Sequence, residues 1–137
     1  MNGLSCWMYV STAAISCAEA EQVVDEIVRL SRSRNAALAV TGALIFSGDS
    51  FAQVIEGPTD AIVEMRAAIS RDTRHCEILT VADNRQRERD FADWSLAYSG
   101  TALFVARELD RIRVAHNKDS PRSRSDLKRL LTEFALG

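Results

Sequence analysis

Apolar residues in this sequence change repeatedly between the two-residue spacing of a strand and the spacing of a helix, and the order of those changes constrains the fold. Residues 4–10 alternate as a strand does, and residues 18–34 carry apolar side chains at helical intervals. Residues 11–22 supply hydroxyl groups that can cap a helix and then acidic residues, which are typical of a helix start. We therefore expect a strand followed by an amphipathic helix.

Two short apolar runs follow this helix and predict a β-hairpin. They cover residues 40–46 and 50–56, and the Ser-Gly-Asp sequence at 47–49 suits a turn that tolerates positive φ. A Gly-Pro pair at 57–58 ends the second strand.

A second helix and two further strands complete the pattern. Residues 59–71 carry apolar side chains on one side of a helix, and either Thr59 or Asp60 is the expected cap. Residues 77–82 are β-branched and apolar enough for a strand, and residues 94–98 suit a final one.

The complete order defines the fold class. The polar residues 83–90 predict a loop before the last strand, which gives the order β-α-β-β-α-β-β. This order predicts an α+β fold, a ferredoxin-like sandwich with one mixed sheet and both helices on one face. The apolar segments 102–116 and 127–135 predict two C-terminal helices, separated by the polar residues 117–126. We expect these helices to pack on the opposite face of the sheet or on a partner subunit.

The composition fits one domain and excludes several classes of function. With 137 residues, 47% of them hydrophobic, the chain can bury a core of its own. The net charge of −2 provides no positive field for nucleic acid or an anionic membrane. The N-terminus has no signal-peptide features, and no stretch approaches the roughly 20 apolar residues of a membrane span. We expect a cytoplasmic protein with no nucleic-acid or membrane partner.

The cysteines and histidines argue against a metal site. Cys6, Cys17 and Cys76 lack the close spacing of zinc sites and redox dithiols. His75 and His116 are the only histidines. We interpret the cysteines as reduced structural thiols and expect no bound metal.

Polar residues inside two expected strands are the first candidates for a site. Gln53 and Glu56 interrupt an apolar strand, and a buried polar side chain without a partner costs roughly 1–3 kcal/mol. Tyr9 and Ser11 lie two residues apart and share one strand face with Trp7. The alternatives are that Gln53 points to solvent and that Tyr9 is a core residue whose hydroxyl meets a backbone carbonyl.

Further polar residues follow the two helices. Asn35 follows the first helix, where the alternative is a C-terminal cap in the left-handed region. Asp72, Arg74 and His75 follow the second helix, where the alternative is a solvated turn. Together with the strand residues, these groups suit the polar edge of a planar heterocycle that lies between the helices.

An ordered set of short motifs over residues 4–98 resembles the BLUF family of flavin photoreceptors. No single tripeptide is specific, but the set keeps the order and approximate spacing of the family. The matching residues are Tyr9-Val10-Ser11, Ser31-Arg32 with Asn35, Thr41-Gly42-Ala43-Leu44, Phe51-Ala52-Gln53 with Glu56-Gly57, Asp72-Thr73-Arg74-His75, and Phe91 with Trp94.

The resemblance implies a domain over residues 1–99 that holds a flavin non-covalently between its two helices. FAD is the expected cofactor, with FMN or riboflavin as alternatives. Asn35 would bind the pyrimidine edge, and Gln53 would bridge the Tyr9 hydroxyl and the N5/O4 edge of the flavin. The expected cofactor-binding residues are Tyr9, Ser11, Arg34, Asn35, Gln53, Asp72, Arg74 and His75.

The resemblance also implies a blue-light sensor without turnover chemistry. In the family, light moves an electron and then a proton from the tyrosine to the flavin, and recombination leaves the glutamine rotated or tautomerised. The products are a small red shift of absorption and recovery in the dark. A phenol carries both the electron and the proton, and a primary amide has a donor and an acceptor end. Residues 100–137 would then form a C-terminal cap or output segment that acts through a homodimer, a larger homo-oligomer or an unidentified downstream protein.

One feature distinguishes this chain from many relatives of that family, and a second bears on its photochemistry. Trp94 and Leu96 stand where many relatives have Trp-x-Met, so signal transfer through the last strand is the property that the leucine puts in doubt. Trp7 lies on the Tyr9 face and would offer a competing electron donor, the alternative being a tryptophan that only packs.

Two other classes of function are compatible with the expected fold. Ferredoxin-like sandwiches also host acyl-phosphate hydrolysis and other small-molecule chemistry. The sequence has no phosphate-cradling glycine loop and no nucleophile with a plausible base, which argues against an enzyme. An interaction domain that has lost its flavin is the second class, and the presence of Tyr9, Gln53 and Asn35 argues against it. Since no effector segment is attached, we expect a stand-alone sensor.

Overall fold

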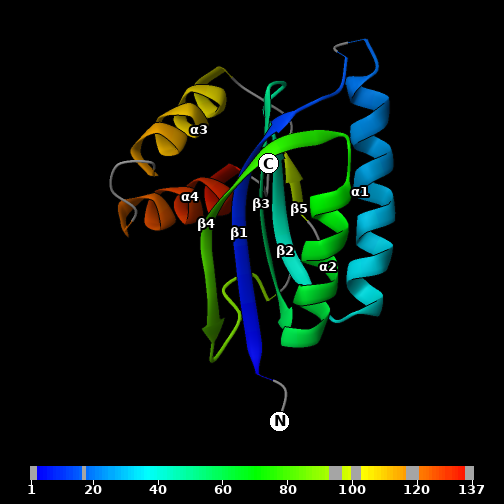
Figure 1. Ribbon diagram of the computed structural model, residues 1–137, viewed down its shortest axis with the longest axis vertical. Coiled ribbons are helices and arrows are strands. Elements are labelled where there is room, and N and C mark those ends of the chain that lie inside the picture. Colours follow the sequence, from blue (N-terminus) through cyan, green and yellow to red (C-terminus); the bar gives the residue numbers. More distant parts are fainter. Residues whose placement is uncertain (1–2, 17, 93–96, 100–102, 117–120, 135–137) are drawn as a thin grey trace.

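The computed structural model contains nine elements in α+β order (Figure 1). It describes all residues except 1–2, 17, 93–96, 100–102, 117–120 and 135–137. The elements are β1 (Leu4–Ala13), α1 (Ala20–Ala37), β2 (Thr41–Phe46), β3 (Ser50–Pro58), α2 (Thr59–Arg71), β4 (His75–Gln86), β5 (Ala97–Ser99), α3 (Leu103–His116) and α4 (Pro121–Phe134).

The five strands form one mixed sheet in the order β4-β1-β3-β2-β5. Strand β1 pairs antiparallel with β3 and β4, β2 pairs antiparallel with β3, and β5 runs parallel to β2. Helices α1 and α2 cover one face of this sheet, and α3 and α4 lie on the other (Figure 1). The predicted ferredoxin-like sandwich, with its C-terminal helices on the opposite sheet face, is therefore confirmed.

Alternate residues of the strands belong to two separate apolar layers. In β1, Trp7 and Tyr9 pack with residues of α2, whereas Met8 and Val10 belong to the layer beneath α3 and α4. Burying each large aliphatic side chain stabilises the fold by roughly 1.5–3 kcal/mol relative to leaving it exposed. The buried residues that α3 and α4 add to their layer are Val105, Leu109, Ile112, Leu127, Leu130 and Leu131.

The β2–β3 hairpin matches its prediction in detail. Gly48 has a φ of 84° in the turn, and Ser47 and Ser50 bond to each other across it, with Ser47 N donating to Ser50 O at 2.8 Å. Within β2, a Cβ at Gly42 would lie 2.0 Å from the carbonyl oxygen of Val54. The close pairing of these two strands therefore requires glycine at position 42.

Strand β4 is longer than the strand predicted over residues 77–82. Residues 83–86, which were expected to begin a loop, belong to it, so the predicted start of the loop is wrong. Arg85 and Gln86 pair with Ser5 and Leu4 of β1. The strand lies at the edge of the sheet, where polar side chains remain in solvent while the backbone pairs. Two register shifts interrupt the β1–β4 ladder, and Glu77, at one of them, has a positive φ of 51°.

The predicted helix caps are also wrong. The N-cap of α1 is Glu19, and that of α2 is Pro58; neither forms a side-chain capping hydrogen bond. Thr59 is instead the first residue of α2, and its hydroxyl donates to the carbonyl oxygen of Gly3 at 3.0 Å. The proline fixes an extended entry into the helix, so the threonine hydroxyl is available to hold the N-terminal segment.

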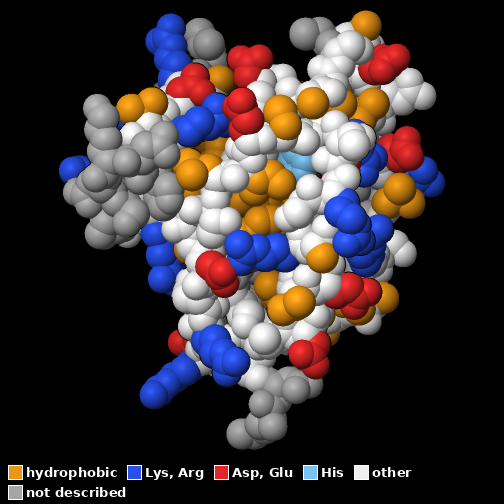
Figure 2. Space-filling model, in the orientation of Figure 1, with side chains coloured by type: hydrophobic (Ala, Val, Ile, Leu, Met, Phe, Trp, Pro, Cys, Tyr) orange, Lys and Arg blue, Asp and Glu red, His pale blue; other side chains and the backbone are white. Residues whose placement is uncertain are grey.

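The surface of the described residues carries mixed charge. On the face shown in Figure 2, acidic and basic side chains are interspersed, and no broad region of one sign forms. Among the described helices, none is long and apolar enough to cross a bilayer.

Candidate functional site

Tyr9 and Gln53 form a buried hydrogen-bonded pair in the middle of the sheet. They face each other in the β1–β3 register and project toward α1 and α2. The Tyr9 hydroxyl donates to Gln53 Oε1 at 2.6 Å, and the two residues are 3% and 5% exposed. Both alternative interpretations from the sequence are therefore wrong, because Gln53 is not in solvent and the Tyr9 hydroxyl does not meet a backbone carbonyl.

The environment of Tyr9 keeps its phenol protonated. Burial raises the pKa of the hydroxyl well above its ordinary value, and the negative charge of Asp72 raises it further. A neutral phenol retains the proton that it donates to Gln53. The pair therefore holds one transferable proton between an aromatic ring and an amide that has a donor at its other end.

A cleft of about 730 Å³, part of it open to solvent, lies between α1 and α2 above this pair. Its walls are mainly apolar, and its polar groups are concentrated on the strands and at the C-terminal ends of the two helices. The lining residues are Tyr9, Ile27, Leu30, Ser31, Arg34, Leu44, Phe51, Gln53, Met65, Ala68, Ile69, Asp72, Arg74 and His75. A mostly apolar cleft with a few convergent polar groups is typical of a site for a small molecule.

An ion pair after α2 supplies part of the charge of the cleft, together with Arg34 of α1. Arg74 donates from Nε to Asp72 Oδ1 at 2.9 Å and from Nη2 to Oδ2 at 2.6 Å, and its backbone N–H also donates to Oδ1. These hydrogen bonds hold the pKa of Asp72 below its usual value despite partial burial, and they raise the pKa of Arg74. Both groups are therefore charged at neutral pH, and the bidentate geometry orients them.

His75 is held by hydrogen bonds at both ring nitrogens. Nε2 lies 2.8 Å from the carbonyl oxygen of Ile69, and because a carbonyl only accepts, Nε2 carries a hydrogen. Nδ1 lies 2.7 Å from the Ser11 hydroxyl, which donates to it when the ring is neutral. The ring also makes edge contacts with Tyr9 and Phe51, with centroids 5.8 and 6.1 Å apart. His75 therefore joins β1, the end of α2 and the start of β4.

The structure brings most of the expected site residues together. Tyr9, Arg34, Gln53, Asp72, Arg74 and His75 all line the cleft.

Two expected residues do not line the cleft. Ser11 is fully buried and reaches the cleft only through His75. Asn35 is fully buried inside α1, so the interpretation as a left-handed cap is wrong. Ala39 has the positive φ of 58° instead, and the carbonyl of Asn35 accepts a hydrogen bond from Val40 N at 2.8 Å. Trp94 and Leu96 lie outside the described residues.

The apolar walls were not identified from the sequence as part of a site. In each helix, three lining residues lie seven, four and three positions before a charged residue of the cleft. Before Arg34 they are Ile27, Leu30 and Ser31, and before Asp72 they are Met65, Ala68 and Ile69. This spacing places each set on one face of its helix. The signal was therefore present, but it is the same pattern that any core-facing helix shows.

Glu56 has a role separate from the cleft. It belongs to the opposite sheet face from Gln53, is 1% exposed, and accepts hydrogen bonds from the backbone N–H groups of Asp90 and Phe91 at 3.1 and 2.7 Å. The side-chain amide of Gln86 donates to it as well. This buried carboxylate fixes the segment that leaves β4.

The described residues contain no group of three or more histidine, cysteine or acidic side chains placed to hold a metal ion. Cys6 and Cys76 are free thiols; Cys6 is buried and Cys76 is exposed.

Comparison with known proteins identifies the class to which this fold and cleft belong. The family model for sensors of blue light using FAD, BLUF, matches residues 4–97. The chain therefore belongs to the BLUF family of blue-light flavin sensors.

Individual relatives agree with this assignment. The chain is 39% identical over 71 residues to the photoactivated adenylate cyclase subunit beta of Euglena longa, which covers 51% of this chain and 8% of that protein. It is 36% identical over 88 residues to the blue light- and temperature-regulated antirepressor BluF of Escherichia coli (strain K12), covering 64% of this chain and 21% of the relative. The chain thus spans only a small part of these curated relatives.

A solved structure matches over nearly the whole length. The dark-state structure of BlrB, a BLUF protein, superposes with a TM-score of 0.76 at 34% identity and covers 95% of this chain and 96% of that one. The match includes the C-terminal helices, because it extends beyond the residues that the family model covers.

Proposed function

We propose that the cleft between α1 and α2 binds FAD non-covalently and that light is sensed through the hydrogen bond between Tyr9 and Gln53. The observation that carries this proposal is the buried 2.6 Å bond from the Tyr9 hydroxyl to Gln53 Oε1, at the floor of the cleft. In this one contact, the Tyr9 phenol can donate an electron and a proton, and the Gln53 amide can exchange its acceptor for a donor.

The residues of the cleft fit a flavin. Apolar side chains of α1 and α2, including Leu30, Met65 and Ile69, suit the two faces of a flat ring. Gln53 is placed to meet the polar edge of that ring. Asp72, Arg74 and Arg34 supply charged groups at one end of the cleft. FMN and riboflavin share this ring, so the same residues would accept them.

The residues of the chain would act in the following order. The bound flavin supplies a light-activated acceptor of one electron. Tyr9 gives up an electron from its ring, and its hydroxyl proton leaves through Gln53 Oε1. The Gln53 amide then rotates or tautomerises, so that Gln53 presents a donor to the Tyr9 hydroxyl in place of its acceptor. Tyr9 regains its electron and proton, and the changed hydrogen bonds of Gln53 persist until dark recovery.

Asn35 and Ser11, which do not line the cleft, would help to position the flavin and Tyr9. We assign Asn35 to the pyrimidine edge of the flavin through its buried position in the last turns of α1. Ser11 and His75 would act together, because their hydrogen bond fixes the imidazole beside Tyr9.

The output would pass to the C-terminal segment. In this proposal residues 1–99 bind the flavin, Trp94 and Leu96 within them act as switch residues, and residues 100–137 transmit the signal. Helices α3 and α4 pack on the sheet face opposite the cleft, so a shift in the sheet reaches them directly. The exchange of one hydrogen bond is worth only about one to a few kcal/mol, so it biases an element that is already near balance. We propose that the receiver is a second copy of the chain or a downstream protein.

The test is visible absorption of the purified protein in the dark, immediately after blue light and during recovery. We expect a flavin spectrum that shifts slightly to the red without bleaching and then relaxes. Tyr9→Phe and Gln53→Leu should keep the flavin and lose the shift. Bound flavin that bleaches would contradict a sensor and favour redox chemistry, whereas a protein that cannot be loaded with flavin would favour an interaction domain.

A further inference from the structure

Trp7 stacks on the tyrosine that the proposed photochemistry uses. The two residues share one face of β1, and their ring centroids are 4.5 Å apart with an angle of 31° between the planes. Trp7 is 1% exposed, and its indole Nε1 donates to Thr80 Oγ1 at 3.0 Å. The indole is therefore fixed within electron-transfer contact of Tyr9.

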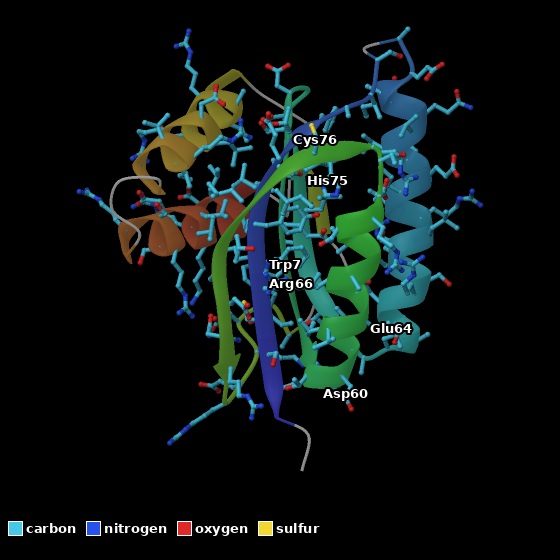
Figure 3. The ribbon with its side chains drawn as sticks, viewed as in Figure 1. Trp7, Asp60, Glu64, Arg66, His75 and Cys76 are labelled. Atoms are coloured by element: carbon cyan, nitrogen blue, oxygen red, sulfur yellow. The ribbon has the colours of Figure 1, made fainter. Side chains whose placement is uncertain are left out.

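A positive charge lies over the Trp7 ring. Arg66 extends from α2, and its guanidinium carbon lies 4.9 Å from the centroid of the Trp7 ring (Figure 3). Arg66 forms an ion pair with Asp83 and places Nη2 3.5 Å from Thr80 Oγ1. The side chain is 39% exposed, so solvent and Asp83 weaken its field without removing it.

This arrangement creates a chemical conflict. An indole loses an electron more easily than a phenol that still holds its proton. If Tyr9 has lost one electron and not yet its proton, Trp7 can return that electron to Tyr9. One electron then moves, no bond is formed or broken, and the positive charge passes from the Tyr9 ring to the Trp7 ring. Tyr9 becomes a neutral phenol again and its proton is no longer driven toward Gln53.

We propose that Arg66 suppresses electron loss from Trp7 and so confines oxidation to Tyr9; this rests on the proposed function. A cation over an indole face attracts the neutral ring and repels the ring once it carries a positive charge. The guanidinium, 4.9 Å from the Trp7 ring centroid, therefore makes Trp7 harder to oxidise. Arg66 is a positioning residue in this role, since it acts on the reaction only through Trp7.

The test is a double-variant cycle on flavin-loaded protein. Arg66→Met removes the charge and keeps an unbranched stem, Trp7→Phe removes the donor, and Arg66→Lys is the matched control that keeps the charge. We measure the yield of the red-shifted state and the transient absorption of the indole radical after a blue pulse. We expect Arg66→Met to lower the yield and raise the ratio of Trp7 to Tyr9 radical by on the order of tenfold.

The cycle separates this role from a structural one. In the Trp7→Phe background, Arg66→Met should leave the yield unchanged, and Arg66→Lys should resemble the parent protein. An equal loss of yield with and without Trp7 would overturn the proposal, because Arg66 would then act through packing. No change in yield or in radical ratio would overturn it as well.

A second measurement distinguishes failure of this inference from failure of the proposed function. Azide radicals oxidise tryptophan in protein that holds no flavin, and the decay of the indole radical reports transfer to tyrosine. The Trp94→Phe background leaves Trp7 as the one tryptophan of the sequence. In this background Arg66→Met should slow the decay of the indole radical, because loss of the positive charge stabilises the oxidised Trp7 ring. A decay that Arg66→Met does not change would refute the role of Arg66 even if no flavin binds.

Discussion

Arg113 of α3 donates from Nη2 to the carbonyl oxygen of Ser11 at 3.3 Å, which joins the C-terminal helices to the strand that carries Tyr9. The same nitrogen donates to Ser50 Oγ at 2.9 Å. Ser11 bonds through its hydroxyl to His75, so Ser11 links a residue that lines the cleft to α3. This is a direct connection between the two faces of the sheet.

Replacement of Arg113 should separate the photochemistry from its effect on α3. In Arg113→Met, loss of the two hydrogen bonds of a half-buried guanidinium should lower the free energy of unfolding by about 1–3 kcal/mol. The red shift should remain, while light-dependent changes in hydrogen exchange over α3 should decrease. Arg111→Met is the control, because Arg111 is 49% exposed, pairs with Glu108 and Asp126 and should alter stability by less than about 1 kcal/mol. An unchanged exchange response in Arg113→Met would mean that this contact does not carry the signal.

The fold could be predicted because its local signals agree with one another. The hairpin illustrates this, since two apolar runs enclose a turn whose Gly48 has the positive φ that the turn requires. The end of β4 could not be predicted, because Arg85 and Gln86 are polar and their pairing with β1 depends on tertiary position at a sheet edge. The prediction of Thr59 as a helix cap was wrong for a related reason, because its hydroxyl donates to the carbonyl oxygen of Gly3, which is distant in sequence.

The candidate site was predicted for its polar residues and not for its walls. Tyr9 and Gln53 stand out because each is a polar group in an apolar strand, yet their direct bond depends on the β1–β3 register, which periodicity does not specify. Ser11 lies behind His75 because the imidazole occupies the space toward the cleft. The division at residues 99 and 100 and the roles of Trp94 and Leu96 stay predictions.

Glu56 should be essential for stability and dispensable for photochemistry. Glu56→Ala would leave the N–H groups of Asp90 and Phe91 without their acceptor, and we expect the free energy of unfolding to fall by about 2–4 kcal/mol. Urea unfolding measures this. Glu64→Ala is the control, since Glu64 is exposed on α2 (Figure 3) and should change stability by less than about 0.5 kcal/mol. Equal effects of the two substitutions would contradict a structural role for Glu56.

Cys6 should make the protein less stable in alkaline solution. Burial, with a smaller contribution from Glu56, raises the pKa of its thiol from 9.0 to about 12. Above pH 9 the unfolded chain loses this proton while the folded chain keeps it. The free energy of unfolding should therefore fall as pH rises from 9 toward 12, by up to about 1.4 kcal/mol per pH unit from this group.

Comparison of Cys6→Ala with the parent protein isolates this contribution. The variant loses about 1 kcal/mol at neutral pH through the missing sulfur but should decline less between pH 9 and 10. Tyr9, whose pKa is also raised by burial, adds its own decline above pH 10, which Tyr9→Phe should remove. Parallel pH profiles of Cys6→Ala and the parent protein would refute this assignment.

When its imidazole is neutral, His75 should carry the hydrogen on Nε2. The Ile69 carbonyl can only accept, which requires hydrogen on Nε2, and the Ser11 hydroxyl can donate to an unprotonated Nδ1. Nitrogen NMR of the neutral ring should show the hydrogen on Nε2 and none on Nδ1, with His116→Gln used to assign the signals. In Ser11→Ala, Nδ1 loses its donor, so the ring should become mobile and flavin affinity should fall several-fold because Tyr9 and Phe51 lose a fixed neighbour. Hydrogen on both nitrogens in the parent protein would show instead that Ser11 accepts from a charged ring, and the cleft would then contain a cation beside Tyr9.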